Sequence, residues 1–176
     1  ISRDMVQQVP EVLDDFRRDP DVRVVVISGA GDKSFISGAD ISEFDKTRAN
    51  AEVARQSSAA STAMFEGIRA FPKPTVAKTR GHCFGGGVAI ACGCDLRIAA
   101  DDALFSIPAA RLGIGYRPTF TRWVIDAVGP ANAREILITA RRYDAADALR
   151  IGLVHRVVPV AAFDDFADEY AAAIAK

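Results

Sequence analysis

The sequence lacks several features that mark particular classes of protein. No apolar run approaches the roughly 18 residues that a membrane-spanning helix requires. Lys and Arg total 22 and Asp and Glu total 23, so the net charge of −1 leaves no basic surplus for binding a nucleic acid. The chain begins with neither Met nor the apolar stretch of a signal peptide. We therefore expect a single domain over residues 1–176 that contacts neither membrane nor nucleic acid, and that lacks terminal parts.

Cysteine is also scarce. An odd number of cysteines, Cys83, Cys92 and Cys94, favours a reducing compartment, so a cytoplasmic location is expected. Cys92 and Cys94 diverge by about 200° on a helix, so they would not face one ion together with His82. The sequence predicts neither a metal site nor a bound cofactor.

Three glycine-dependent motifs are missing as well. Gly29-Ala-Gly31 begins like a dinucleotide-binding loop, but Ser34 stands where the third glycine belongs. No glycine run is followed by the Lys-Ser or Lys-Thr of a P-loop. The G-x-S-x-G turn that carries the nucleophile of many hydrolases does not occur either.

What the chain does contain is an alternation of helical and strand-like segments, which predicts an α/β fold with mostly parallel strands. Residues 22–28 and 75–78 are apolar and β-branched, as expected for strands buried on both faces. Further strands are predicted at residues 96–99, 103–107 and 153–158. Helices are predicted at residues 5–16, 53–71, 119–128, 130–138, from 144 onward, and 163–174.

Two glycine-containing loops follow the first two of these strands. They are Ser37-Gly38-Ala39-Asp40 and Phe84-Gly85-Gly86-Gly87. If the strands are neighbours, backbone N–H groups of both loops can converge on one negative oxygen, forming an oxyanion hole. The alternative is purely structural: glycine loops often serve as tight turns, and Asp40 with Glu43 also fits a helix capping box.

The stretches SFISGADISEF, KPTVAKTRGHCFGGGVAIACGCDLRIA, FSIPAARLGI and YDAADALRIGLVHRVVP resemble the enoyl-CoA hydratase/isomerase (crotonase) family. The resemblance implies a spiral of ββα units, assembly as a homotrimer or dimer of trimers, and an acyl-CoA thioester as substrate. It also implies that the N–H groups of Ala39 and Gly86 polarise the thioester carbonyl. The residues Ser37, Gly38, Asp40 and Ile41 would border the CoA moiety, and the family's C-terminal helical part would be absent.

Hydratases of this family use two glutamates to place and activate water. At the matching positions this sequence has Ala89 and Ala109, which can neither accept nor give a proton. Both alanines, together with Phe84 and Gly85, would lie against the substrate. Because general acid–base catalysis contributes typically about 10²–10⁴-fold, ordinary hydration should be badly impaired.

A reaction that needs only an anion hole remains feasible. The resemblance extends to methylmalonyl-CoA decarboxylases, which have a tyrosine at the place of Tyr116, and a neutral phenol there can donate a proton. Arg117 could attract an acidic acyl group. The alternatives without a functional role are a half-buried aromatic residue in a loop for Tyr116 and a solvated surface position for Arg117. Of the two histidines, His82 is expected to pack at a strand end and His155 to lie on the surface.

The hypothesis that follows is an acyl-CoA enzyme that stabilises a thioester enolate, with decarboxylation of a malonyl-type thioester as the favoured reaction. One alternative is a divergent hydratase or isomerase of fatty-acid metabolism. Another is an acyl-CoA binding protein without catalysis.

Overall fold

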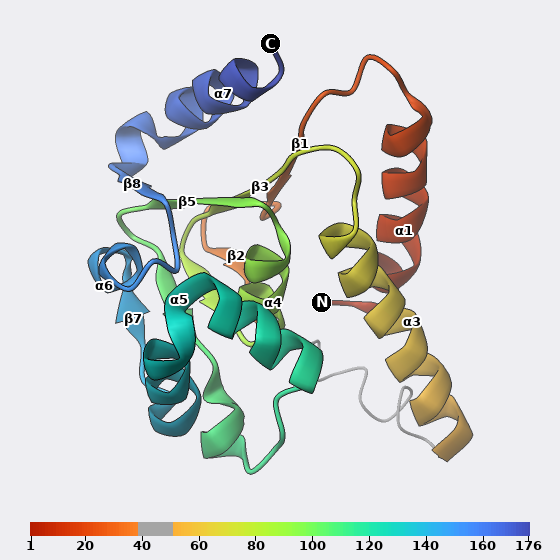
Figure 1. Ribbon diagram of the computed structural model, residues 1–176, viewed down its shortest axis with the longest axis vertical. Helices are drawn as coiled ribbons and strands as arrows, with labels where there is room; N and C mark the ends of the chain where they lie inside the picture. The colour runs from red at the N-terminus through yellow and green to blue at the C-terminus, as the bar shows by residue number, and fades with distance from the viewer. Residues whose placement is uncertain (39–50) are drawn as a thin grey trace.

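The computed structural model describes residues 1–38 and 51–176, and it contains two four-stranded sheets (Figure 1). The predicted site residues Ala39, Asp40 and Ile41 lie outside the described residues. The first sheet is parallel throughout, with the order β1 (Val25–Ser28), β3 (Thr75–Thr79), β5 (Leu96–Ala100) and β8 (Arg156–Val158). The second has the order β2 (Ser34–Ile36), β4 (His82–Phe84), β6 (Leu104–Ser106) and β7 (Tyr143–Asp144), with only β7 antiparallel.

The chain visits the two sheets in turn. Each of the first three pairs of successive strands gives its first member to the first sheet and its second to the second sheet, and a helix then follows the pair. In the last pair the order is reversed, with β7 in the second sheet, β8 in the first and a helix between them. The three such units end in α3 (Ala51–Arg69), α4 (Gly86–Gly93) and α5 (Pro118–Thr139). This arrangement confirms the predicted α/β class and the spiral of ββα units with mostly parallel strands.

The short strands β2 and β4 were not predicted, and glycine explains how the chain reaches them. A Cβ atom on Gly29 would lie 2.1 Å from the Ser34 carbonyl oxygen, and one on Gly81 would lie 2.2 Å from that of Lys33. Gly81 also has a φ of +58°, which side chains disfavour. Only glycine therefore allows the backbone segments to touch where the chain passes from one sheet to the other.

Three predicted strands are shorter than expected, and β6 differs least, by one residue at each end. Strand β1 begins at Val25 rather than at residue 22, and it lies at the edge of its sheet, where Val26 is 39% exposed. The expectation of burial on both faces was wrong for this strand, although it holds for most of β3. Strand β8 covers Arg156–Val158 only, because Leu153 and Val154 are buried in the turn before it.

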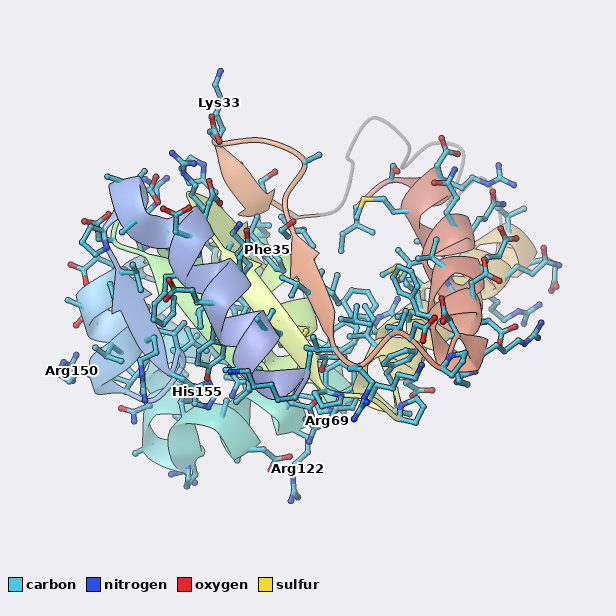
Figure 2. All side chains as sticks on the ribbon, turned by 90° about the horizontal axis from the view of Figure 1, so that it is seen from above. Lys33, Phe35, Arg69, Arg122, Arg150 and His155 are labelled. Carbon is cyan, nitrogen blue, oxygen red and sulfur yellow. The ribbon has the colours of Figure 1, made fainter. Side chains whose placement is uncertain are left out.

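Helix α4 lies in the middle of the molecule (Figure 1). Its residues from Gly87 to Gly93 are all buried, as expected for a helix that is apolar on every side. Helix α1 (Arg3–Arg18) packs beside α3, and α7 (Phe163–Ile174) covers one face of the first sheet through Phe163 and Ala167 (Figure 2). Helix α6 (Ala145–Arg150) is capped by the Asp144 side chain.

Two local details complete the core. Gly129 has a φ of +77° inside α5, so the segment consists of two helices that meet at Gly129 and Pro130, as predicted. The buried Arg97 side chain donates hydrogen bonds to the carbonyls of Leu153 and Cys94. Its backbone N–H donates to Nδ1 of His155 at 3.1 Å, so His155 has a structural partner and is not a simple surface residue.

Within residues 1–38 and 51–176, no helix is long and apolar enough to cross a membrane. The same residues contain no group of three or more His, Cys, Asp or Glu side chains that could hold a metal ion. All three cysteines are buried and free, and burial raises the pKa of Cys92 to about 11 and of Cys94 to about 12.

The substitution Gly87→Ala should lower the free energy of unfolding by about 1–3 kcal/mol, because the new methyl group would lie 2.4 Å from the Ile36 carbonyl oxygen. Gly67→Ala in α3 is the matched control, since its nearest neighbour would be the Leu13 side chain at 3.9 Å. The control should raise stability by roughly 0.5–1 kcal/mol. Urea denaturation of both variants measures the difference; equal stabilities would contradict the close approach at Gly87.

Candidate active site

The described parts of the two glycine-containing loops begin at the C-terminal ends of neighbouring strands of the second sheet. Ser37 and Gly38 follow β2, Gly85 follows β4, and these strands pair in parallel. The approach is close because Gly87, in the first turn of α4, has no side chain to keep it away from Ile36. The sequence analysis placed these loops directly after the strands predicted at residues 22–28 and 75–78. In the structure the loops follow β2 and β4 instead.

The start of α4 supplies the amide groups of the site. Gly85 precedes the helix with a φ of +53°, and no side chain caps the helix. Its own N–H donates to the Ser106 carbonyl at 2.8 Å. The next N–H groups, of Gly86 and Gly87, have no acceptor within the helix because they belong to its first turn. Gly86 is half-buried, and a Cβ on it would lie 2.8 Å from the end of the Ile1 side chain. An uncapped helix start of this kind favours an anionic oxygen.

Tyr116 holds the peptide that carries the Gly86 amide. Its hydroxyl donates to the Gly85 carbonyl oxygen at 3.0 Å, and the Ala89 N–H donates to the same oxygen at 3.2 Å. The Gly85 carbonyl and the Gly86 N–H belong to one planar peptide unit, so fixing the oxygen also fixes the direction of the N–H. Hydrogen bonds in series also polarise one another, which makes the Gly86 N–H a better donor.

The Tyr116 hydroxyl keeps its proton under physiological conditions. Burial raises its pKa well above the ordinary value of 10, and the nearby Cys92 and Cys83 thiols act in the same direction. The group is therefore a neutral donor at the pH of the cell, and the bond to Gly85 persists there.

An aromatic cluster, formed by Phe65, Tyr116, Phe120 and Trp123, borders the glycines. Phe65 lies beside Gly86, since a Cβ there would be 3.5 Å from the end of its ring. The rings of Phe65 and Phe120 are 4.4 Å apart, and those of Tyr116 and Phe120 are 5.7 Å apart. Phe120 also contacts Trp123 at 5.4 Å. Gly86 therefore adjoins a largely buried apolar cluster that joins α3 to α5.

Arg117 lies at the start of α5 and reaches α3. Its Nη1 donates to the Thr62 hydroxyl at 2.6 Å and its Nη2 to the Ser58 hydroxyl at 3.2 Å. The guanidinium lies 5.4 Å from the centre of the Phe120 ring. The structure thus brings the side chains of Arg117 and Tyr116 to the same aromatic cluster.

The other predicted site residues are placed as follows. Ala89 is fully buried within α4, and Ala109 is buried in the 3₁₀ helix η2 (Pro108–Leu112). Phe84 interacts with His82 and Arg142, on the face of β4 opposite to Cys83, and His82 itself is exposed. Ser37 is exposed and Gly38 half-buried.

Sequence reasoning missed Phe65, Phe120, Ser58 and Thr62. None belongs to a motif, and all lie on helices whose buried side alone was predicted. The helical spacing pointed to Met64 and Ile68 as the buried residues of α3, and Phe65 is their neighbour. Only the packing of α3 against α5 gives these residues a place at the site.

A separate cavity of about 240 Å³ lies at the ends of β1 and β3, and none of Gly85, Gly86 and Gly87 lines it. Lys78 and Arg80 line it, but Lys78 pairs with Asp164 at 2.5 Å and Arg80 with Asp32 at 2.9 Å. Their charges are already balanced, so this cavity offers no counterpart to the amide site at Gly86.

The whole chain, residues 1–176, matches the family model described as enoyl-CoA hydratase/isomerase. It is 38% identical to crotonyl-CoA hydratase of Syntrophomonas wolfei over 160 residues, and these residues make up 90% of this chain and 60% of that protein. It is 37% identical over 165 residues to carnitinyl-CoA dehydratase of Citrobacter koseri, covering 93% and 62%. The chain therefore spans about 60% of the length of these curated relatives.

Solved structures give the same result. The chain resembles an enoyl-CoA hydratase/carnithine racemase from Magnetospirillum magneticum with a TM-score of 0.93 and 36% identity, over 98% of this chain and 64% of that one. It resembles an enoyl-CoA hydratase from Bacillus anthracis with a TM-score of 0.93 and 31% identity, over 99% and 67%.

The substitution Tyr116→Phe keeps the ring beside Phe120 but removes the donor to Gly85. We expect the free energy of unfolding to fall by about 1 kcal/mol and amide hydrogen exchange in the segment containing Gly86 to become faster. Tyr170→Phe in α7 is the control, because Tyr170 stacks on Phe166, remote from the glycines. If exchange at Gly86 changes equally in both variants, Tyr116 does not hold this peptide.

Proposed function

Because the chain belongs to the enoyl-CoA hydratase/isomerase family, we propose that it binds the thioester of an acyl-CoA and stabilises its enolate at the start of α4. The observation that carries this proposal is the Gly85–Gly86 peptide, whose carbonyl is held by the neutral Tyr116 hydroxyl while its N–H belongs to the first turn of a helix that no side chain caps. A second donor, the Ala39 N–H, is proposed from the family resemblance.

The reaction we propose is loss of CO₂ from a malonyl-type thioester. Ala89 and Ala109 stand where hydratases would carry acids, and the contacts of Gly85, Tyr116 and Arg117 found among the described residues include no carboxylate. Decarboxylation does not require a base, since no proton has to be removed from the substrate. A carboxylate beside the substrate would instead repel the carboxylate that leaves.

The steps follow from the donors. The bond between the α-carbon and the carboxylate breaks, CO₂ departs, and the electron pair forms an enolate whose oxygen accepts from the Gly86 N–H. Water then protonates the α-carbon, giving the shorter acyl thioester and hydroxide. Tyr116 acts as a positioning residue, because its proton is already donated to the Gly85 carbonyl. One donor of this kind typically contributes about 2.7–4 kcal/mol of transition-state stabilisation.

A second candidate function is a divergent hydratase. It is favoured by the names of the relatives, a crotonyl-CoA hydratase and a carnitinyl-CoA dehydratase at 37–38% identity. In that case groups other than residues 89 and 109 would hold the water. An acyl-CoA binding protein without turnover is the remaining alternative. Assembly as a homotrimer or a dimer of trimers and a cytoplasmic location stay proposals.

The test is a panel of thioesters that separates these functions. The full-length protein is incubated with crotonyl-CoA, malonyl-CoA and methylmalonyl-CoA, and mass spectrometry scores gain of water or loss of CO₂ while calorimetry follows binding. We expect loss of CO₂ from a malonyl-type substrate without hydration of crotonyl-CoA. Hydration would place the second candidate first, and tight binding of all three without turnover would favour the binding protein.

Introducing an acid at the edge of the site should inhibit the proposed reaction. Ala109→Glu is expected to lower the rate of CO₂ loss at least about tenfold relative to Ala109→Gln, because only the glutamate repels the substrate carboxylate. The glutamine variant controls for the added volume at this buried position. Equal rates in the two variants, or a faster reaction with glutamate, would argue against an enolate site free of carboxylates.

A further inference from the structure

Within residues 1–38 and 51–176, no neighbour balances the charge of Arg117. Its two hydrogen-bond acceptors, the hydroxyls of Thr62 and Ser58, are neutral. In the part of the chain that the structure describes, no carboxylate pairs with it. Arg122, only one turn further along α5, differs: its Nε donates to Asp126 at 2.8 Å, and its side chain points outward (Figure 2).

The surroundings of Arg117 increase the attraction of its guanidinium for an anion. Arg117 is half-buried, and its guanidinium lies 5.4 Å from the centre of the Phe120 ring. A positive charge beside apolar groups is screened less by water than one on an open surface, so its attraction for an anion is larger.

The guanidinium of Arg117 is also held in a fixed position, and some of its N–H donors are not used by the contacts that hold it. The Thr62 hydroxyl accepts from Nη1 and gives its own proton to the Ser58 carbonyl at 2.8 Å, so its orientation is set by α3. A guanidinium has five N–H donors, and the contacts to Thr62 and Ser58 use two of them. The remaining donors suit a carboxylate, which can accept two parallel hydrogen bonds.

Arg117 and Gly86 both adjoin the same aromatic cluster. Phe120 contacts both Arg117 and Phe65, and Phe65 lies beside Gly86. Tyr116, the residue before Arg117, is hydrogen-bonded to Gly85. An acyl group whose carbonyl oxygen meets Gly86 would therefore lie near Tyr116 and the residue that follows it, Arg117, whose half-buried guanidinium borders this cluster.

We propose that Arg117, supported by Thr62 and Ser58, binds a carboxylate carried by the acyl group, so that the protein prefers thioesters of dicarboxylic acids over neutral acyl thioesters. The proposal rests on the proposed binding of an acyl-CoA. Strong pairing with a carboxylate that leaves as CO₂ would stabilise the ground state, and only stronger binding of the transition state accelerates a reaction. Arg117 therefore determines which thioester binds, and its loss raises KM without lowering kcat.

The phosphates of CoA offer an alternative partner for Arg117, and the choice of ligands separates the two. Succinyl-CoA, glutaryl-CoA and butyryl-CoA carry identical phosphates, but only the first two have an acyl carboxylate. Calorimetry with the full-length protein should give at least about tenfold tighter binding of one dicarboxylic thioester than of butyryl-CoA.

The variant Arg117→Gln should lose this preference, by about 10–100-fold, while its affinity for butyryl-CoA stays within about twofold. Arg117→Lys should keep part of the preference, because it retains the charge but not the paired donors. Arg122→Gln is the control and should bind all three ligands as the unmodified protein does. If Arg117→Gln fails to fold, Thr62→Val serves instead, since it removes the support of the guanidinium and should weaken the preference.

Three other outcomes would overturn the proposal, and each would point to a different reason. Equal weakening of all three ligands in Arg117→Gln would assign Arg117 to the CoA phosphates. No preference in the unmodified protein would show that the acyl carboxylate is not recognised. Failure of all three to bind would overturn the proposed function itself, and the subsite with it.

Discussion

The first turn of α4 lies against the carbonyl oxygen of Ile36, and no side chain fits between them. This contact is the constraint on which the site depends. It brings the end of β2 to the start of the buried helix and places the loop after β2 beside the loop after β4. The helix also begins without a side-chain cap, because the residue that precedes it is Gly85. The N–H groups that lack a partner for this reason are the ones proposed to meet the substrate oxygen.

The rest of the site serves to fix one peptide unit. The Tyr116 hydroxyl and the Ala89 N–H both donate to the Gly85 carbonyl, and the same peptide carries the Gly86 N–H. Phe65 lies beside it and packs against Phe120, and electrostatic interactions next to apolar groups are stronger than in water. A donor that is already oriented needs no reorganisation when charge develops, which is why such an arrangement stabilises an enolate effectively.

The sequence predicted the α/β class, the family, most helices and the position of the glycine loops, because these depend on local patterns. It did not predict β2 and β4, since strands of three residues are too short to show an alternation of polar and apolar positions. Nor could it predict that Tyr116 bonds to Gly85 or that Arg117 bonds to Ser58 and Thr62. These partners are 31 to 59 residues apart and meet only through the packing of α3, α4 and α5. Burial on both faces was wrong for β1 because an edge position does not appear in a local pattern. The roles assigned to Ala39, Asp40 and Ile41 stay predictions.

The most direct test of the account is the infrared stretching frequency of a bound thioester carbonyl, measured with an acyl-CoA labelled with ¹³C at that carbon. If the Gly86 amide polarises the carbonyl and Tyr116 holds that amide in place, the band of the bound thioester lies at lower frequency than that of the free one. The shift should then be smaller in Tyr116→Phe. A bound carbonyl with the frequency of the free thioester, or an equal shift in the two proteins, would contradict the claim.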